Sequence, residues 1–304
     1  MTTQTHPASV ISLGAEREVG ESLLQKALRR LRRDRLTMIA LAVIVVLALL
    51  SIFAPFITDH LLHVDPNRTN SEARFLPIGS PGRLLGTDDL GRDHLARLLH
   101  AGRVSLGIGF AGATLTLAIG LFFGAMTGYF GGMVDDIMNW VITTLDSIPS
   151  LYLLLIIAAI LSPSAEALII VLALVGWTTT TRLIRGETLS IREREFIISA
   201  RAIGASPWRI MFVHILPNLI SVTAISLANG IGNLILIESA LSFLNVGVQP
   251  PTATWGNMLS NSQTYFTLGG HLVVLPGLLI VVTVLCLYII GDGVRDAFDP
   301  TTVD

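Results

Sequence analysis

The sequence predicts an all-α integral membrane protein that crosses the bilayer as six transmembrane helices. Of its 304 residues, 52% are hydrophobic and 14% are charged, whereas a water-soluble domain is about 25% charged. Apolar segments recur along the chain, and a helix needs about 20 such residues to cross the hydrocarbon core. Basic residues are concentrated in a few of the intervening segments. The net charge of −2 gives no reason to expect nucleic acid as a partner.

The apolar segments set the expected spans, and Asp146 in the third is the one charged residue inside them. We expect these spans at Met38–Phe56, Ser105–Phe130, Trp140–Leu161, Ala167–Thr181, Leu219–Ile237 and Leu272–Gly291. The fourth is short, and we expect it to extend outward across Pro163–Glu166. A basic segment precedes the first span and no small-residue cleavage site follows it, so we expect this span to be retained.

The distribution of basic residues predicts the orientation, because lysine and arginine near span ends stay in the cytoplasm. Fourteen of the 20 lie before the first span, between spans four and five, or in the C-terminal tail. The other six lie in the long loop 58–103, which we place outside. Both termini are therefore expected to be cytoplasmic.

The pattern divides the chain into four parts. Residues 1–37 form a cytoplasmic segment, in which Glu21–Arg35 is a basic amphipathic helix and Met1–Gly20 is expected to be disordered. That helix can lie on anionic lipid of the inner leaflet or serve as a docking surface for a partner. Residues 38–104 hold the first span and the outer loop. Residues 105–293 form a core of five spans with a cytoplasmic loop at 182–217, and residues 294–304 form a tail.

Polar residues within the spans are candidates for a pathway or gate. Asp146 and Glu238 lie several residues from span ends, where we expect them to reach water or an interface; a proton relay and a packing or gating role are both open. Asn229 and Asn233 are four residues apart and share one helix face. They can hydrogen-bond a neighbouring helix or line a polar path.

A stripe of glycines in the second span lets another helix approach closely, within this chain or from a second subunit. The stripe consists of Gly112, Gly120, Gly124 and Gly128.

The loop between spans four and five predicts a helix–turn–helix elbow that projects from the membrane. Arg185–Arg201 has a helical apolar stripe, and Gly204 suits a left-handed helix end. Ser206 suits an N-cap with Pro207 at the first helical position, before a second helix at Trp208–Ile215. An elbow of this form suits a groove on a soluble partner, although an interfacial loop without a partner remains possible on these grounds.

The same loop resembles the inner-membrane permeases of ATP-binding-cassette importers, specifically the second permease of the dipeptide/oligopeptide/nickel group. That superfamily has EAA, three residues, glycine and then Leu-Pro after a fixed interval. Here Ile198-Ser199-Ala200 precedes Gly204, and the motif ends at Leu216-Pro217. Further similar segments follow the family's order: Leu85–Asp93, Glu238–Leu244, Gly247–Pro251 with Trp255-Gly256, Gly291–Asp296 and Asp299-Pro300. Asn245 stands where the family usually has glycine.

The resemblance implies a type I importer permease fold and a non-enzymatic role in transport across a prokaryotic cell membrane. It implies a homologous second permease, two ATPase subunits and an extracytoplasmic binding protein as partners. Coupling to an ATPase would fall to Ser199, Ala200, Arg201, Ala202, Gly204, Ala205, Ser206, Pro207 and Trp208. ATP and magnesium would be bound by the ATPases, since this chain has no Gly-x-x-x-x-Gly-Lys-Ser/Thr loop.

No cofactor or metal is expected in the chain itself. It has one cysteine, Cys286, and the histidines of the outer loop do not form a compact ligand set. An ion-coupled secondary carrier is the alternative function, which predicts buried charge networks and inverted repeats; a membrane scaffold is a third. The solute can be a peptide, nickel, glutathione or another molecule.

Overall fold

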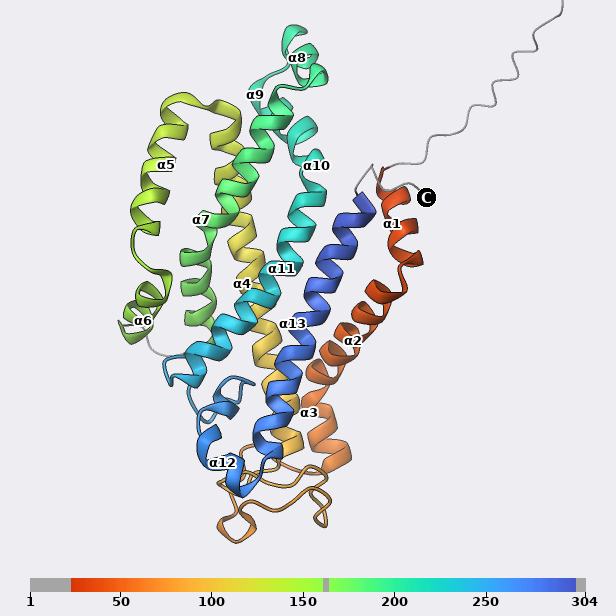
Figure 1. Cartoon of the computed structure of the whole chain (residues 1–304), viewed down its shortest axis with the longest axis vertical. Helices are drawn as coiled ribbons and strands as arrows, with labels where there is room; N and C mark the ends of the chain where they lie inside the picture. The colour runs from red at the N-terminus through yellow and green to blue at the C-terminus, as the bar shows by residue number, and fades with distance from the viewer. Residues whose placement is uncertain (1–22, 161–163, 299–304) are drawn as a thin grey trace, which may run out of the picture.

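The computed structural model describes residues 23–160 and 164–298 as an elongated helical bundle. Figure 1 shows long helices running between a loop-rich end, built from the segment after α3, and an opposite end from which α8 projects. The helix α1 and the last turns of α13 lie toward the α8 end (Figure 1). The segment expected to be disordered, Met1–Gly20, lies outside the described residues, as does the closing Asp299-Pro300.

The chain enters the bundle through α1 (Leu23–Arg33) and α2 (Arg35–Ile52), followed by the short turns α3 (Ala54–Phe56) and η1 (Ile57–Leu62). The expected N-terminal helix is confirmed, and it packs against α13 and α2. Asp34 separates the two helices because its side chain accepts a hydrogen bond from the Leu36 amide at 3.0 Å. The Thr37 hydroxyl also donates to Asp34 and holds the pKa of that carboxyl below its ordinary value.

Helix α4 (His94–Phe130) is longer than the span predicted at Ser105–Phe130. It begins earlier because the Asp93 side chain accepts a hydrogen bond from the Ala96 amide at 2.8 Å. At 37 residues it is about 55 Å long, whereas the hydrocarbon core is about 30 Å thick. Its first turns therefore extend into the loop-rich end of the molecule.

Three glycines of the stripe, Gly120, Gly124 and Gly128, pack inside this chain against α7 (Ala165–Arg192), whereas Gly112 faces Leu234. A Cβ atom at Gly124 would lie 2.7 Å from the Ile184 Cβ, and one at Gly128 would lie 2.7 Å from the Thr188 Cβ. Small residues at these positions let the two backbones approach, which strengthens dispersion contacts. Helix α7 also extends well beyond the expected Ala167–Thr181, which makes it one of the longest elements.

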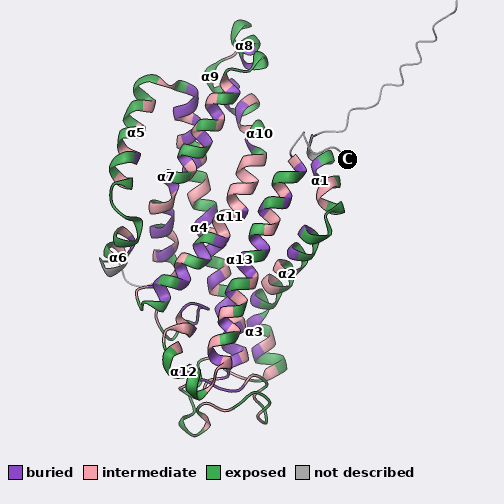
Figure 2. Cartoon of the chain, viewed as in Figure 1, coloured by how far each residue is buried: buried purple, intermediate pink, exposed green. Residues whose placement is uncertain are grey.

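The third predicted span, Trp140–Leu161, is not one continuous helix. It consists of α5 (Gly132–Asp146) and α6 (Ser150–Ile160), and the two are bent by 79°. Pro149 explains the break, because proline disfavours helical backbone at the residue before it and suits the start of a helix. Helix α5 also begins at Gly132, before the expected start of this span at Trp140. Most residues of α5 are exposed or half-buried (Figure 2).

A short turn, η2 (Ser71–Ala73), lies in the loop before α4. The elements that follow α7 are α8 (Glu195–Ala202), α9 (Pro207–Arg209), the wide turn η3 (Ile210–Ile215), α10 (Leu216–Asn218), α11 (Ile220–Phe243), η4 (Asn257–Leu259), α12 (Ser262–Leu268) and α13 (His271–Phe298). In the described part of the chain, five helices are long and apolar enough to cross a membrane, or six if the bent pair counts as one span. The predicted number of six therefore depends on α5 and α6 acting together.

Candidate functional site

The elbow between α7 and α11 is shaped by its own backbone. The Gly204 amide donates to the Arg201 carbonyl at 3.1 Å, and the Ala205 amide donates to the Ala200 carbonyl at 3.0 Å. This pair of bonds is a Schellman ending, and Gly204 adopts the left-handed φ of +83° that it requires. The chain turns and restarts at once, because the Ser206 hydroxyl accepts from the Arg209 amide. The predicted end and start of the two helices are confirmed here.

Apolar side chains seat the elbow on the bundle. Ile197 and Ala200 of α8 are buried in one cluster with Tyr129 of α4 and Ile184 of α7. Arg201 lies over the Tyr129 ring, with its guanidinium carbon 6.0 Å from the ring centre. The cluster therefore joins α8 to both long helices.

The tip of the elbow leaves apolar side chains uncovered. Ile203 is 86% exposed and Trp208 is 54% exposed. Figure 1 shows α8 projecting from the end of the bundle. An exposed apolar tip on a firmly seated helix fits a protein interface.

Two helix boundaries in the elbow differ from the prediction. The expected continuous helix Arg185–Arg201 is wrong, because α7 ends at Arg192 and α8 begins at Glu195. The second helix contains a widened turn, in which the Leu216 amide donates to the Met211 carbonyl. Pro217 follows that turn, and a proline ring interferes with the carbonyl four residues before it.

A cavity of about 680 Å³ lies in the membrane part of the chain, bordered by α4, α5, α6, α7 and α11. Asp146, Asn229 and Asn233 all line it, with further hydroxyl groups from Thr178, Ser226 and Tyr288. The structure therefore brings together three of the four residues proposed for a pathway. Among the described residues, the Oδ1 atom of Asn229 has no hydrogen-bond partner and is buried against Gly291 of α13.

Asp146 has a basic partner that the span boundaries did not reveal. Its carboxylate lies 2.6 Å from a guanidinium nitrogen of Arg182 on α7. Arg182 follows the expected end of the fourth span directly, so the pair forms only because α7 continues as helix.

Glu238 belongs elsewhere, and the expectation that it reaches water or an interface is wrong. Its side chain is fully buried. It accepts hydrogen bonds from the hydroxyl of Ser242 at 2.8 Å and from that of Ser105 at 3.1 Å. The amide of Trp255 donates to the same Ser105 oxygen at 3.1 Å. This cluster joins α4, α11 and the segment after α11, which is a packing role.

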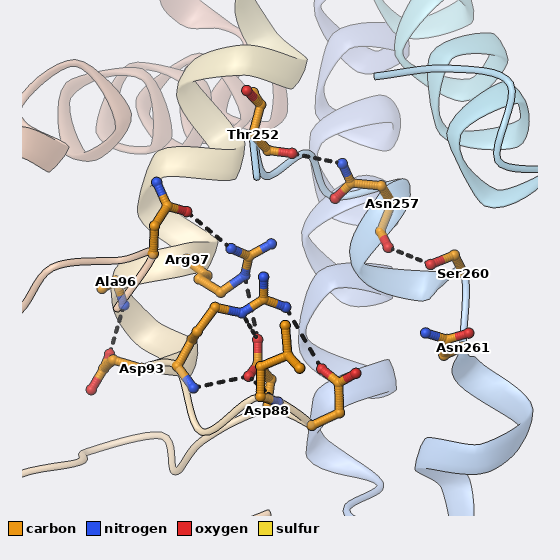
Figure 3. A network of polar contacts seen from close by, with 12 residues as sticks. Asp88, Asp93, Ala96, Arg97, Thr252, Asn257, Ser260 and Asn261 are labelled. Atoms are coloured by element: carbon orange, nitrogen blue, oxygen red, sulfur yellow. Dashed lines mark hydrogen bonds and ion pairs between the residues drawn. The ribbon is translucent and has the colours of Figure 1, made fainter. Parts of the chain in front are cut away.

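The segment Leu85–Asp93 forms a polar network at the loop-rich end (Figure 3). Asp88 accepts from the Arg92 side chain at 2.7 Å and lies 3.5 Å from the Nε atom of Arg97. Gly86 and Gly91 have positive φ, and a Cβ atom on either would overlap a backbone carbonyl. Arg97 lies on the early turns of α4, outside the motifs that stand out in the sequence.

The network faces a second layer built from the segment before α13. Asn257 donates to the Thr252 carbonyl at 2.8 Å and accepts at its own carbonyl from Ser260 (Figure 3). Burial raises the pKa of the nearby Tyr265 to about 12, so this phenol stays protonated. Both layers border a small cavity of about 160 Å³.

Asn245 adopts a φ of +60°, the left-handed conformation that glycine favours. Asparagine tolerates this conformation better than most residues. The turn therefore forms with asparagine in the position where the resembled family usually has glycine.

Comparison with known proteins agrees with this architecture. Residues 120–304 match the family model described as the binding-protein-dependent transport system inner membrane component. Residues 22–77 match the N-terminal transmembrane domain of oligopeptide transport permease C.

Individual relatives are similar over most of their length. The chain is 37% identical to the dipeptide transport system permease protein DppC of Haemophilus influenzae, over 88% of this chain and 92% of that protein. It is 33% identical to the oligopeptide transport system permease protein OppC of Bacillus subtilis, over 92% and 90%. An inward-facing structure of the MetNI methionine ABC transporter shares the fold, with a TM-score of 0.55 at 20% identity, over 67% of this chain and 96% of that one. The chain therefore belongs to the family of binding-protein-dependent transport inner membrane components, as a multi-pass, non-catalytic permease subunit of an ATP-binding-cassette importer.

Proposed function

We propose that this permease imports dipeptides or oligopeptides and provides half of their path across the bilayer. The proposed substrate class rests on the names of the relatives, which are dipeptide and oligopeptide permeases. The cavity between α5, α7 and α11 fits a peptide, because its lining is mainly apolar with a few amide, hydroxyl and carboxylate groups. Its volume of about 680 Å³ falls in the range of small-molecule sites.

We further propose the partners of the complex. A homologous second permease completes the pathway, two ATPases bind at the α8 end, and an extracytoplasmic binding protein delivers the solute at the loop-rich end. ATP and magnesium belong to the ATPases, and the bilayer surrounds the bundle. No nucleic acid takes part. We also propose the division of the chain at 1–37, 38–104, 105–293 and 294–304, with the coupling loop at 182–217.

One observation carries the mechanism: the elbow is fixed at its base and apolar at its tip. Its proposed contact with the ATPase comprises Ser199, Ala200, Arg201, Ala202, Gly204, Ala205, Ser206, Pro207 and Trp208, together with Ile203, which the sequence motif did not single out. ATP-driven closure of the ATPases then moves α8 as a lever and changes the side on which the pathway opens. An ion-coupled secondary carrier has no support from the family.

The test replaces the apolar tip with a charge. The complete transporter carrying Ile203→Glu is placed in proteoliposomes, and uptake of labelled trialanine and ATP hydrolysis are measured. A central apolar side chain of an interface carries about 2 kcal/mol or more, so uptake should fall about 30-fold. Stimulation of ATP hydrolysis by the binding protein should be lost as well.

The control is Ile203→Leu, which keeps an apolar side chain of similar size and should retain uptake. Purified permease without ATPases should take up nothing. Normal coupling in Ile203→Glu would refute the coupling role of the elbow. Absence of trialanine uptake in a wild-type transporter that hydrolyses ATP in response to its binding protein would refute the peptide assignment.

A further inference from the structure

The bent pair α5–α6 is an arm in which α6 packs against α7, whereas α5 is held less closely. Among the described elements, the backbone of α5 packs closely only against α4, to which it is joined. Ile142 is its one buried residue, while Met133 and Trp140 are 77% and 69% exposed. Figure 1 shows α5 running beside α7 with α6 turned across its far end. Helix packing therefore does not fix the position of α5 relative to α7.

The joint between α4 and the arm is a turn made of two glycines. Gly131 and Gly132 have φ angles of +64° and +54°, and glycine occupies this region without steric penalty. A Cβ atom on Gly132 would meet nothing within 4 Å. The turn itself has no side chains that would fix the position of α5 relative to α7.

Two ion pairs hold α5 to α7. The Arg185 guanidinium binds both carboxylate oxygens of Asp135, a bidentate geometry that restricts orientation as well as distance. Arg182 pairs with Asp146 at the far end of α5. The Asp135 and Arg185 side chains are 15% and 28% exposed, so water screens this pair less than a pair on an open surface.

The arm also forms one wall of the membrane cavity. Leu145, Asp146, Pro149 and Leu153 line it from α5–α6, opposite Asn233 of α11. The distance between α5 and α7 therefore affects the width of the cavity.

Helix α7 leads directly to the elbow. Only Glu193 and Arg194 separate its end from α8, and α4 and α7 are locked together by the glycine contacts. A displacement of α8 therefore reaches α7 as a rigid movement. Helix α6 can follow it through its apolar contacts with α7, and α5 through its side-chain ties.

We propose that the ion pairs Asp135–Arg185 and Asp146–Arg182 transmit the movement of α7 to α5, so that this part of the cavity wall follows the ATPase cycle. Asp135 and Arg185 are then positioning residues for transport, at a distance from the solute. The inference rests on the proposed coupling role of the elbow. It adds the contacts through which a movement of α8 reaches the wall of the membrane cavity.

The test uses Asp135→Asn and Arg185→Gln in the complete transporter, in proteoliposomes with labelled trialanine. Energetic coupling between distant sites commonly amounts to a factor of about five or more. We expect uptake to fall by about that factor in each variant, while ATP hydrolysis stays within about twofold of wild type. Asp136→Asn is the matched control, because Asp136 is the adjacent exposed carboxylate on the same helix, and it should leave uptake unchanged.

A charge exchange and a distance measurement separate transmission from mere stability. Asp135→Arg combined with Arg185→Asp restores an opposite-charge pair and should recover uptake that each single change loses. Spin labels at Ile137→Cys and Ser190→Cys, in a Cys286→Ala background, report the α5–α7 distance. The distance should be the same with and without trapped ATP in wild type, and should broaden or lengthen in Asp135→Asn.

Unchanged uptake and unchanged label distances in Asp135→Asn would overturn the proposal, as would failure of the exchanged pair to recover uptake. The elbow variant distinguishes the two levels of inference. If Ile203→Glu abolishes coupling while Asp135→Asn has no effect, only the transmission route fails. If Ile203→Glu has no effect, the coupling role itself fails.

Discussion

At the scale of single residues, the four polar positions proposed for a pathway have different roles. Asp146, Asn229 and Asn233 line one cavity, whereas Glu238 is enclosed by hydroxyl groups of α4 and α11. Sequence distance from a span end did not separate them, because burial depends on which helices surround a position. The separation gives Glu238 a packing environment, and we propose a place on the solute path for the other three only.

This assignment predicts different outcomes for two substitutions of Glu238. Glutamine can still accept from one serine and donate to the other, so Glu238→Gln should keep both stability and uptake. Glu238→Ala leaves Ser105 and Ser242 without their partner, and a buried polar group left unpaired costs about 1–3 kcal/mol. In thermal unfolding of the purified transporter, only the Glu238→Ala variant should have a lower midpoint temperature than wild type.

Loss of uptake in a Glu238→Gln transporter of normal thermal stability would instead favour the proton-relay role. Equal midpoints for alanine and wild type would show that the cluster contributes nothing to the fold.

At the scale of elements, the pairing of α4 with α7 is the central packing interaction of the membrane part. The glycines of α4 are needed because the facing positions on α7 already hold branched side chains, among them Thr180, Ile184 and Thr188. The spacing of the glycines predicted a close helix contact but left its partner open. The partner could be identified only once both helices were placed.

Gly124→Ala should therefore be costly although alanine favours helices. Its Cβ would lie 2.8 Å from the Thr181 carbonyl oxygen, and overpacking typically costs about 1–3 kcal/mol. Gly107→Ala on the same helix is the control, since a Cβ there meets nothing within 4 Å. We expect a lower unfolding midpoint and less assembled complex for Gly124→Ala, and no loss for Gly107→Ala. Similar midpoints for the two would mean that α4 and α7 can separate without penalty.

At the scale of the whole molecule, the elbow and the outer network lie at opposite ends of the bundle (Figure 1). The charge distribution predicts that the elbow faces the cytoplasm. The fold is consistent with this orientation, because α1 and the end of α13 lie toward the elbow (Figure 1). The length of α4 agrees with an outer loop that stands clear of the bilayer.

Single cysteines can test this orientation, because the native Cys286 is buried and is replaced by alanine as background. Leu84 is 63% exposed in the outer loop and Ile203 is 86% exposed in the elbow. A membrane-impermeant maleimide added to intact cells should label Leu84→Cys at once. It should label Ile203→Cys only after the membrane is opened. The reverse pattern, or equal labelling of both before opening, would contradict the topology.

The sequence by itself determined the local features. Runs of apolar residues located most of the spans because lipid exposure is a property of the residues themselves. Ser206, Pro207 and Gly204 marked the turn of the elbow because caps and glycine endings depend on near neighbours along the chain. The same local logic failed for the third span, because the run of apolar residues does not show that α5 and α6 meet at a bend of 79°.

Only the tertiary structure decided which distant residues meet. The pairing of Asp135 with Arg185 joins positions 50 residues apart, and the bond from Trp255 to Ser105 joins positions 150 apart. No periodicity along the chain encodes such contacts, since they depend on how the helices are placed around each other. For this protein the local pattern therefore predicted spans and an elbow, whereas the packing of α4, α5, α7 and α11 decided where the cavity lies and what holds its wall.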